Sequence, residues 1–351
     1  MPEHFVFHYQ QALQLESGEQ LPGFQLAYTT YGTPNQDNSN VIWVCHALTG
    51  SSDFTEWWGG LFGEGKLFDP ENWFIVCANT LGGCYGSTGP LSINPNTLKP
   101  YFHTFPQLTN RDVVAAFDLL RVHLGIGQIH TLIGGSLGGQ QALEWAIYRP
   151  EVMQRLVHVA SNARHSAWGI AFNETQRMAI RQDPSWELPT ADAGMQGLKT
   201  ARAIAMLSYR HYKSYDATQQ EPGCDKTDNY NASSYQVYQG EKLSGRFNAY
   251  TYWLLSKAMD SHHIGRGRGS VAIALQKLKA RTLFVGVDTD LLFPVQEQRA
   301  LHEQVSGSAF SLLHSDYGHD GFLVEEAQLA AAIQKFYEQE LKPAFTYERQ
   351  V

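Results

Sequence analysis

The sequence has little of what marks a nucleic-acid-binding or membrane-spanning protein. Its 26 lysines and arginines are outnumbered by 34 aspartates and glutamates, which gives a formal net charge of −8. A chain with this balance lacks the basic surface that attracts nucleic acid or an acidic membrane. No apolar run approaches the roughly 20 residues that a membrane-spanning helix needs. We therefore expect no nucleic-acid partner and no membrane partner.

Cysteines are also scarce, and their spacing fits no common metal-binding motif. The four are Cys45, Cys77, Cys84 and Cys224, and no two of them form a Cys-x-x-Cys pair. We therefore expect neither a disulfide framework nor a bound metal. The first residues show no basic stretch followed by an apolar one, as a secretory signal peptide would. A reducing cytoplasm is the location that we expect.

What the chain does have is an alternation of short apolar runs and amphipathic helices. The runs Val41–Cys45 and Phe74–Cys77 are apolar throughout, which is typical of strands covered on both faces. Strands alternating with helices such as Arg111–Leu124 predict an α/β fold with a mostly parallel central sheet. The predicted strands span residues 4–9, 25–31, 41–47, 73–79, 129–134, 156–160, 282–287 and 310–313.

Between residues 164 and 277 the pattern becomes helical. Helices are predicted at 173–181, 198–212 and 247–260, with a polar loop at 221–234, and a last helix is predicted at 324–341. We therefore expect residues 1–163 and 278–351 to form the core that contains the sheet. Residues 164–277 are expected to form a helical lid inserted into it.

Ser136 occupies a distinctive turn in this pattern. The segment Gly134–Gly138 fits G-x-S-x-G, a short buried strand precedes it, and an amphipathic helix follows it and ends at Pro150. Strand, tight turn and helix in this order are the context of a nucleophile elbow. The alternative is a glycine-rich turn whose serine only caps the helix, but the flanking elements favour a nucleophile.

A serine nucleophile needs a histidine base and an acid that orients the base. In the hydrolase order the acid and the histidine follow later strands. Asp288 and Asp290 both follow the strand at 282–287, and His319 follows the strand at 310–313. Spacing does not choose between the two aspartates. His319 could also be an ordinary loop histidine, although its place in the order favours catalysis.

An oxyanion intermediate needs two backbone amides directed at it. One is expected from Leu137, directly after the serine, and the second from Leu48, in the loop after the third strand. His46 lies in the same loop. We interpret His46 as a packed residue that anchors the loop rather than as a catalytic one.

Seven longer segments carry a resemblance to one family. They read CHALTGSS, NTLGGCYGSTGPLSINP, GGSLGGQQALEW, FNETQRMAI, ARAIAMLSYR, GVDTDLLFP and YGHDGF. Through them the chain resembles homoserine O-acetyltransferases, which have the α/β-hydrolase fold, from about residue 20 to about residue 340. The resemblance implies the triad Ser136, Asp290 and His319, and so selects Asp290 over Asp288.

The resemblance also implies substrate contacts from Arg202, Tyr209 and Asp320. Arg202 and Tyr209 are two helical turns apart and would share one face of a helix. Arg202 could bind a carboxylate and Asp320 an ammonium group. Without the resemblance, the first two would be an ordinary surface pair and Asp320 a helix cap. The sequence departs from the family pattern at Leu137, where methionine is usual, and at Asp53, where histidine is usual.

These residues imply a transfer of an acetyl group from acetyl-CoA to the hydroxyl of L-homoserine by a ping-pong mechanism. Such an acyltransferase needs no permanently bound cofactor, because acetyl-CoA is a substrate. The resemblance further implies a homodimer built through the lid helices and a role in methionine biosynthesis. Alternatives on the same scaffold are a homoserine O-succinyltransferase, a serine O-acyltransferase and a plain serine esterase.

Overall fold

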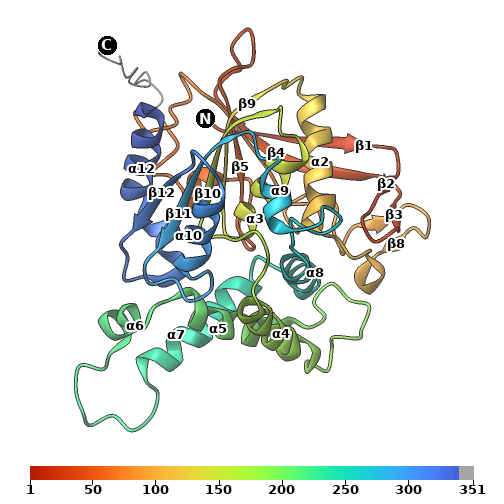
Figure 1. Ribbon diagram of the computed structural model, residues 1–351. Coiled ribbons are helices and arrows are strands. Elements are labelled where there is room, and N and C mark those ends of the chain that lie inside the picture. Colours follow the sequence, from red (N-terminus) through yellow and green to blue (C-terminus); the bar gives the residue numbers. More distant parts are fainter. Residues whose placement is uncertain (340–351) are drawn as a thin grey trace, which may run out of the picture.

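An eight-stranded sheet forms the centre of the computed structural model, which describes residues 1–339 (Figure 1). The first three strands in spatial order, β1, β4 and β6, are antiparallel neighbours, and the rest of the sheet is parallel. This confirms the mostly parallel sheet predicted from the sequence. In spatial order the strands are β1 (Glu3–Tyr9), β4 (Phe24–Tyr31), β6 (Phe74–Ala78), β5 (Val41–Cys45), β9 (Ile129–Gly135), β10 (Met153–Val159), β11 (Arg281–Val287) and β12 (Ala309–Leu313).

Helices cover both faces of the sheet, because its central strands are apolar on both sides. On one face Trp43 and Leu132 pack with side chains of α2 (Asn110–His123), α3 (Leu137–Tyr148), α9 (Val271–Leu275) and α10 (Val295–Gln304). On the other face Val44 and Ile133 pack with α1 (Phe54–Trp57), α11 (Gly321–Val324) and α12 (Glu326–Glu338). Two short hairpins, β2–β3 (Leu13–Gln14 and Gln20–Leu21) and β7–β8 (Ile93–Asn94 and Lys99–Pro100), lie beside the sheet and were not predicted.

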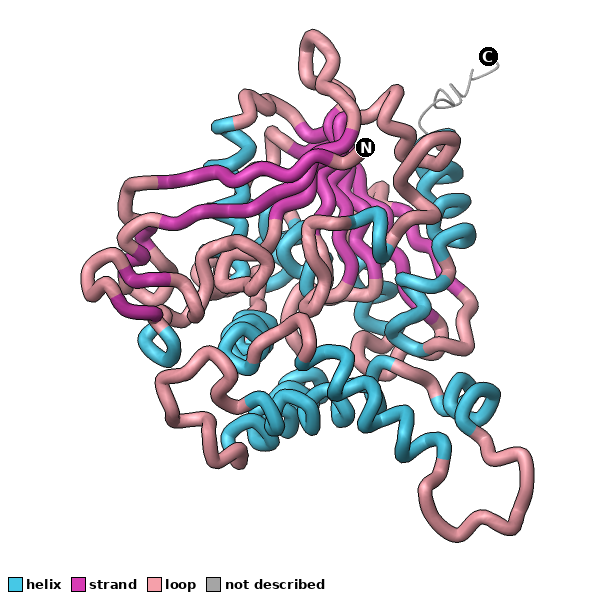
Figure 2. The backbone as a smooth tube through the Cα atoms, turned by 180° about the vertical axis from the view of Figure 1, so that it is seen from behind, coloured by secondary structure: helices cyan, strands magenta, loops and turns pink. Residues whose placement is uncertain are grey.

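Of the six helices between β10 and β11, α9 packs against the sheet, and the other five lie together at one end of it (Figures 1 and 2). They are α4 (Ala167–Arg181), α5 (Met195–Tyr209), α6 (Tyr212–Gln219), α7 (Asn231–Ser244) and α8 (Ala249–Asp260). A separate cluster of buried side chains joins them to Leu48, Leu137 and Phe293 of the sheet region. These helices therefore pack directly over the loops that follow the parallel strands.

Several predicted helix boundaries were wrong. The helix expected at 173–181 begins earlier, at Ala167, where the Ser166 side chain caps it by accepting a hydrogen bond from the Gly169 amide at 3.1 Å. The helix expected at 198–212 ends at Tyr209, and α6 starts anew after His211, whose ring accepts a hydrogen bond from the Lys213 amide at 3.4 Å. The loop expected at 221–234 already contains the start of α7, a weakly amphipathic helix whose Glu241 pairs with Lys199 of α5 at 2.9 Å. The boundary after Tyr209 is a local cap at His211, and α7 packs on α5 through a tertiary contact that periodicity does not contain.

The helix predicted at 324–341 is observed as α12, and a short helix that was not predicted, α11, precedes it. The indole nitrogen of Trp58 donates a hydrogen bond to the Phe322 carbonyl of α11 at 2.9 Å. Helix α11 ends at Val324, and α12 begins at Glu326. The predicted end at Leu341 lies outside the described residues.

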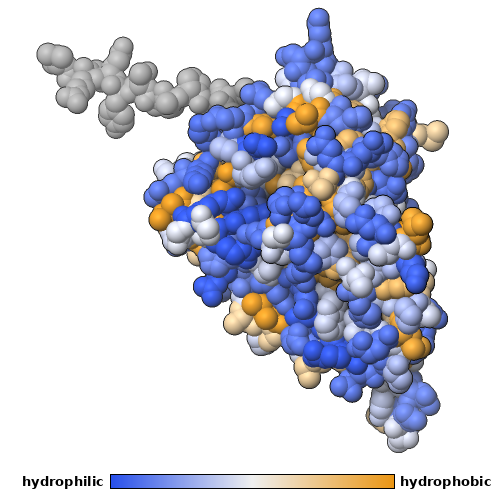
Figure 3. Space-filling view, turned by 90° about the vertical axis from the view of Figure 1, so that its right-hand side faces the viewer, coloured by the Kyte–Doolittle hydropathy of each residue, from blue (hydrophilic) through white to orange (hydrophobic). Residues whose placement is uncertain are grey.

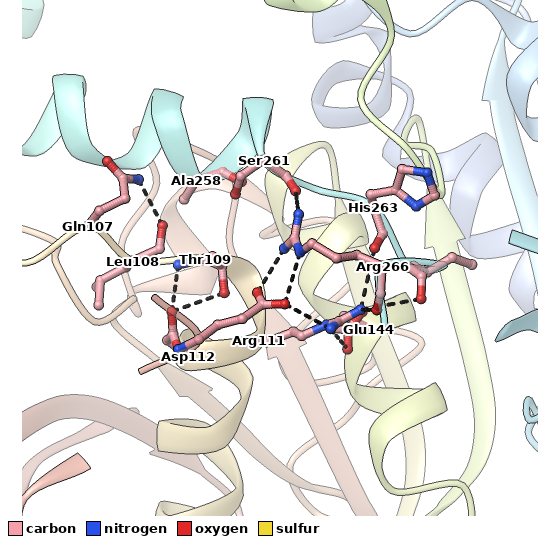
Figure 4. A network of polar contacts seen from close by, with 12 residues as sticks. Gln107, Leu108, Thr109, Arg111, Asp112, Glu144, Ala258, Ser261, His263 and Arg266 are labelled. Carbon is pink, nitrogen blue, oxygen red and sulfur yellow. Dashed lines mark hydrogen bonds and ion pairs between the residues drawn. The ribbon is translucent and has the colours of Figure 1, made fainter. Parts of the chain in front are cut away.

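A network of charged side chains fixes the segment that returns from α8 to the sheet region (Figure 4). Glu16 pairs with Arg111 of α2 and with Arg266 of the returning segment, both at 2.8 Å. Arg111 also approaches the buried Glu144 of α3 at 3.2 Å. Because Glu144 is buried, losing one of its cationic partners would leave a poorly compensated charge.

The surface seen in Figure 3 carries hydrophobic residues in small, separate patches among hydrophilic ones. In residues 1–339 no helix combines the length and the apolar character that crossing a membrane requires.

Candidate active site

Ser136 stands at the sharp turn between β9 and α3, in a strained backbone conformation with φ 57° and ψ −123°. The turn closes only because its neighbours lack side chains. A Cβ on Gly134 would lie 2.2 Å from the Gly138 carbonyl oxygen, and one on Gly138 would lie 2.0 Å from the Cys45 carbonyl oxygen. The Ser136 side chain makes no capping hydrogen bond to α3. The geometry is therefore that of a nucleophile elbow and not of a helix cap.

A continuous chain of hydrogen bonds joins the three side chains that the sequence singled out. His319 Nε2 lies 2.9 Å from Ser136 Oγ, and His319 Nδ1 lies 2.7 Å from Asp290 Oδ2. All three residues are buried. His319 can therefore take a proton from the serine while Asp290 holds the imidazole ring in the required tautomer.

The two candidate aspartates have different partners. Asp290 Oδ1 accepts hydrogen bonds from the amides of Leu292 and Phe293 at 2.8 and 2.9 Å, which leaves Oδ2 directed at His319. Asp288 instead contacts His314 Nδ1 at 2.9 Å at a more exposed position. Only Asp290 is placed to orient the histidine next to the serine.

Aromatic rings enclose the catalytic imidazole. Phe293 stacks on His319 with ring centroids 5.1 Å apart, and Phe322 and Tyr209 lie 5.2 and 5.8 Å away. The sequence singled out Tyr209, as a substrate contact, but not Phe293 and Phe322, although each of these lies three residues from a triad member. The rings fix the plane of the imidazole and exclude water from it.

The loop after β5 lies against the nucleophile elbow. A Cβ on Gly138 would meet the carbonyl oxygens of Cys45 and His46 at 2.0 and 2.9 Å. Leu48 and Leu137 are both buried, and both belong to the cluster under the five helices. The loop that carries the Leu48 amide thus contacts the start of the helix that carries the Leu137 amide, as an oxyanion site requires.

His46 is a packed residue, as we interpreted it from the sequence. Its Nδ1 donates to the Ala47 carbonyl at 2.8 Å, and its Nε2 accepts from the Thr80 amide at 3.0 Å. Burial lowers the pKa of His46 to about 4. The ring is therefore neutral near pH 7 and joins the β5 loop to the loop after β6.

Comparison with known proteins places these features in a family. The family model described as "alpha/beta hydrolase fold" matches residues 40–326. A homoserine O-acetyltransferase of Cyclobacterium marinum is 54% identical over 332 residues, which cover 95% of this chain and 94% of that protein. The chain belongs to the homoserine O-acetyltransferase family.

Solved structures agree with this placement. The crystal structure of homoserine O-acetyltransferase from Bacillus anthracis matches with a TM-score of 0.88 at 25% identity and covers 99% of this chain and 100% of that one. Esterase E22 matches with a TM-score of 0.87 at 25% identity and covers 96% of this chain and 100% of that one. The predicted α/β-hydrolase fold is thus confirmed, and it is shared with hydrolytic enzymes.

Arg202 and Tyr209, which the resemblance implies as substrate contacts, share one face of α5 beside the triad. The Arg202 guanidinium carbon lies 5.2 Å from the centre of the Tyr209 ring, and this ring is next to His319. Arg202 Nε is buried and has no hydrogen-bond partner within residues 1–339. Burial raises the pKa of the Tyr209 phenol, so its hydroxyl stays protonated. An unpaired guanidinium donor therefore lies close to the triad.

Asp320 is paired with a cation that the sequence reading missed. Its Oδ2 lies 2.9 Å from Arg210 Nε, and its side chain makes no capping hydrogen bond to α11. Burial raises the pKa of the Asp320 carboxyl, while Arg210, Arg202 and His319 oppose the rise. Arg210 follows Tyr209 directly, but only the fold shows that it faces Asp320.

The two departures from the family pattern lie in different surroundings. Leu137 is fully buried beneath the five helices, and the oxyanion role assigned to it uses its backbone amide. Asp53 precedes α1, lies 3.5 Å from His4, and lines a cavity of about 500 Å³ beside the β5 loop. Within residues 1–339 no group of three histidines, cysteines or carboxylates could hold a metal ion.

Proposed function

We propose that this acyltransferase moves an acetyl group from acetyl-CoA to the hydroxyl of L-homoserine, a step of methionine biosynthesis, by a ping-pong mechanism. The observation that carries the proposal is the hydrogen-bonded chain Ser136–His319–Asp290 in a member of this family. No permanently bound cofactor is needed, because the acyl donor is itself a substrate.

In the first half-reaction, Ser136 Oγ attacks the thioester carbonyl carbon while His319 Nε2 takes the hydroxyl proton. The Leu48 and Leu137 amides stabilise the oxyanion that forms. When this intermediate collapses, the carbon–sulfur bond breaks and His319 returns the proton to the departing thiolate. The acetyl group then remains on Ser136, and free coenzyme A leaves.

In the second half-reaction, the homoserine hydroxyl gives its proton to His319 and attacks the acetyl-serine ester. The intermediate releases Ser136 as the proton returns to its oxygen. Opposite charges are available for the two ends of the amino acid: Arg202 suits its carboxylate, and Asp320, whose Oδ2 is held by Arg210, can offer Oδ1 to its ammonium group. Aromatic rings around His319 exclude the competing water.

An acyl-donor by acceptor matrix tests this proposal. Acetyl-CoA and succinyl-CoA are each mixed with L-homoserine, L-serine or water, and free coenzyme A and the acylated product are measured. The proposal predicts that acetyl-CoA with homoserine gives the highest kcat/KM. A higher value with succinyl-CoA or with serine would assign the chain to one of the related acyltransferases on this scaffold.

Ester hydrolysis is the second candidate, favoured by the close match to an esterase structure. An esterase needs the triad and the oxyanion amides, but ester hydrolysis does not require a pair of opposite charges beside the triad. The Arg202 and Asp320 side chains next to His319 therefore favour an amino-acid acceptor. Hydrolysis of acetyl-CoA faster than acetylation of homoserine would reverse this choice.

The proposal includes a homodimer formed through the five helices, in the cytoplasm. Large apolar side chains are exposed on three of them, at Trp168 and Met178 on α4, Leu207 on α5 and Val237 on α7. Sedimentation velocity is predicted to show a dimer that Val237→Glu weakens. The matched change Val122→Glu, at an exposed position of α2, should leave the dimer intact.

A further inference from the structure

A hollow that the proposed mechanism does not use lies between the glycine-rich loop at residues 82–92 and the turn that joins α7 to α8. Its volume is about 530 Å³. Gly83, Gly86 and Gly89 line one side of it, and Asn248 and Arg246 line another. Arg246 also lines the 500 Å³ cavity beside the β5 loop, so the two spaces adjoin at this side chain.

Within residues 1–339, the lining of this hollow carries positive charge and no negative charge. Among the residues that line it, all in the described part of the chain, Arg246 alone has a charged side chain. Arg246 Nη1 donates to the Thr49 carbonyl at 2.7 Å and also to the Tyr85 hydroxyl. Within residues 1–339 its Nε and Nη2 make no hydrogen bond, so part of the guanidinium fork remains available to an anion.

The start of α8 adds further donors on the same hollow. Asn248 caps this helix, and its Oδ1 accepts a hydrogen bond from the Thr251 amide at 2.8 Å. Its side-chain NH₂ group has no partner among the described residues. Thr251 lines the hollow and is fully buried, yet its Oγ1 also has no partner in residues 1–339. A buried hydroxyl without a partner is costly, and the positive end of a helix favours a negatively charged ligand.

We propose that this hollow binds the phosphate-bearing nucleotide end of the acyl-CoA donor, with Arg246, Asn248 and Thr251 as phosphate ligands. The inference rests on the proposed function, because it assumes a coenzyme A thioester. The adjoining cavity leads along Thr49 toward the oxyanion loop, and it would hold the uncharged pantetheine arm. That cavity is lined by two carboxylates, Asp53 and Glu56, and by two cations, Lys242 and Arg246, so its charges balance, whereas the described residues that line the hollow include a cation and no carboxylate.

The test compares acetyl-CoA with S-acetylpantetheine, a donor that has the same thioester and arm but no nucleotide. Asn248→Asp keeps an acceptor that can cap α8 and places a negative charge on the hollow. It is expected to raise the KM for acetyl-CoA roughly tenfold or more, with kcat and the KM for S-acetylpantetheine unchanged. Ser270→Asp is the matched control, because Ser270 caps α9 in the same way and does not line the hollow.

Thr251→Val is the second variant. A purely structural role predicts an unchanged KM for acetyl-CoA and an unchanged or higher Tm, because the buried hydroxyl without a partner is removed. The proposal predicts that the KM for acetyl-CoA rises while the KM for S-acetylpantetheine does not. Arg246 is a less clean target, since its contact with Thr49 also supports the oxyanion loop.

The outcomes separate this inference from the proposed function. If Asn248→Asp changes both donors equally or changes neither, the inference is wrong, while acetylation of homoserine by the wild type still supports the proposed function. If the wild type uses neither donor, the proposed function fails. Calorimetric titration with adenosine 3′,5′-bisphosphate then tests whether the hollow binds a nucleotide phosphate. Binding that is lost in Asn248→Asp supports a nucleotide phosphate site. Absent binding, or equal binding of inorganic phosphate, overturns it.

Discussion

Asp288 and Asp290 show how one turn gives two carboxylates different surroundings. The sequence placed both after the same strand, and spacing alone did not choose between them. The choice depends on which oxygen faces His319, and the amides of Leu292 and Phe293 determine that by holding Asp290 Oδ1. Backbone contacts of this kind are not visible in a pattern of residue types.

Asp290→Asn tests this assignment. The amide keeps the shape of the side chain but favours the wrong imidazole tautomer, so kcat should fall by about 10⁴-fold. Asp288→Asn disturbs only the contact with His314 and should have a mild effect on kcat. Steady-state kinetics of both variants provide the measurement, and a larger loss in Asp288→Asn would show that the wrong carboxylate was chosen.

Arg202 allows the two half-reactions to be separated. In the proposed scheme acetyl-CoA acylates Ser136 before any carboxylate is bound, so Arg202→Ala should acylate almost normally. Loss of the carboxylate contact should lower kcat/KM for homoserine by roughly 30- to 150-fold, which corresponds to about 2–3 kcal/mol. Arg202→Lys should recover only part of this loss, because an ammonium group lacks the planar fork.

Hydrolysis of an aryl acetate is the control for Arg202, since this ester has no carboxylate to bind. Its kcat/KM should be nearly the same in the wild type and in both variants. Equal losses on homoserine and on the aryl acetate would mean that Arg202 supports the triad or the fold rather than the acceptor.

At the scale of elements, the elbow depends on how closely α3 approaches the loop after β5. Gly138→Ala places a Cβ 2.0 Å from the Cys45 carbonyl oxygen, so α3 must move. We predict a loss of about 1–3 kcal/mol in the free energy of unfolding, although alanine is the better helix former. A shift of the Leu137 amide by about 1 Å would also lower kcat/KM by roughly 100-fold.

Gly127→Ala is the control for that change, because nothing lies within 4 Å of its Cβ position. It should leave stability and kcat/KM unchanged. Denaturant unfolding and steady-state kinetics provide both measurements. A Gly138→Ala variant as stable and active as Gly127→Ala would show that the close approach is not required.

The sequence predicted the elements better than their ends. Apolar runs located all eight strands of the sheet, and the pattern is continuous in central strands such as β5 and β6, which are buried on both faces. The short helix α11 was not predicted, and the contact that accompanies it, from the Trp58 indole to the Phe322 carbonyl, joins residues distant in the sequence. The partner of Asp320 was missed for the same reason, since Arg210 approaches it only in the folded chain.

At the scale of the whole molecule, buried neutral histidines make stability depend on pH. Burial lowers the pKa of His46, His130 and His165 to about 4 and that of His158 to about 3. In the unfolded chain these groups titrate near 6.5. Between about pH 6.5 and pH 4 the unfolded state therefore binds more protons, and stability falls as the pH decreases.

The loss should be at most about 1.4 kcal/mol per pH unit for each histidine. Buried carboxyls with raised pKa values, such as Asp260 and Glu297, act in the opposite direction at the acid end of this window. Urea unfolding at pH 7 and pH 5 provides the measurement. His158→Leu removes one titration and should show a smaller difference between the two pH values, and an equal difference would contradict the assignment.

The most direct test of the central claim is the mass of Ser136 during turnover. After rapid mixing with acetyl-CoA in the absence of homoserine, mass spectrometry should find one acetyl group on the peptide that contains Ser136. Addition of homoserine should remove that group and yield O-acetylhomoserine, and Ser136→Ala should show neither adduct nor turnover. Acetylation of homoserine by Ser136→Ala, or turnover by the wild type without an acetylated Ser136, would contradict the double-displacement mechanism.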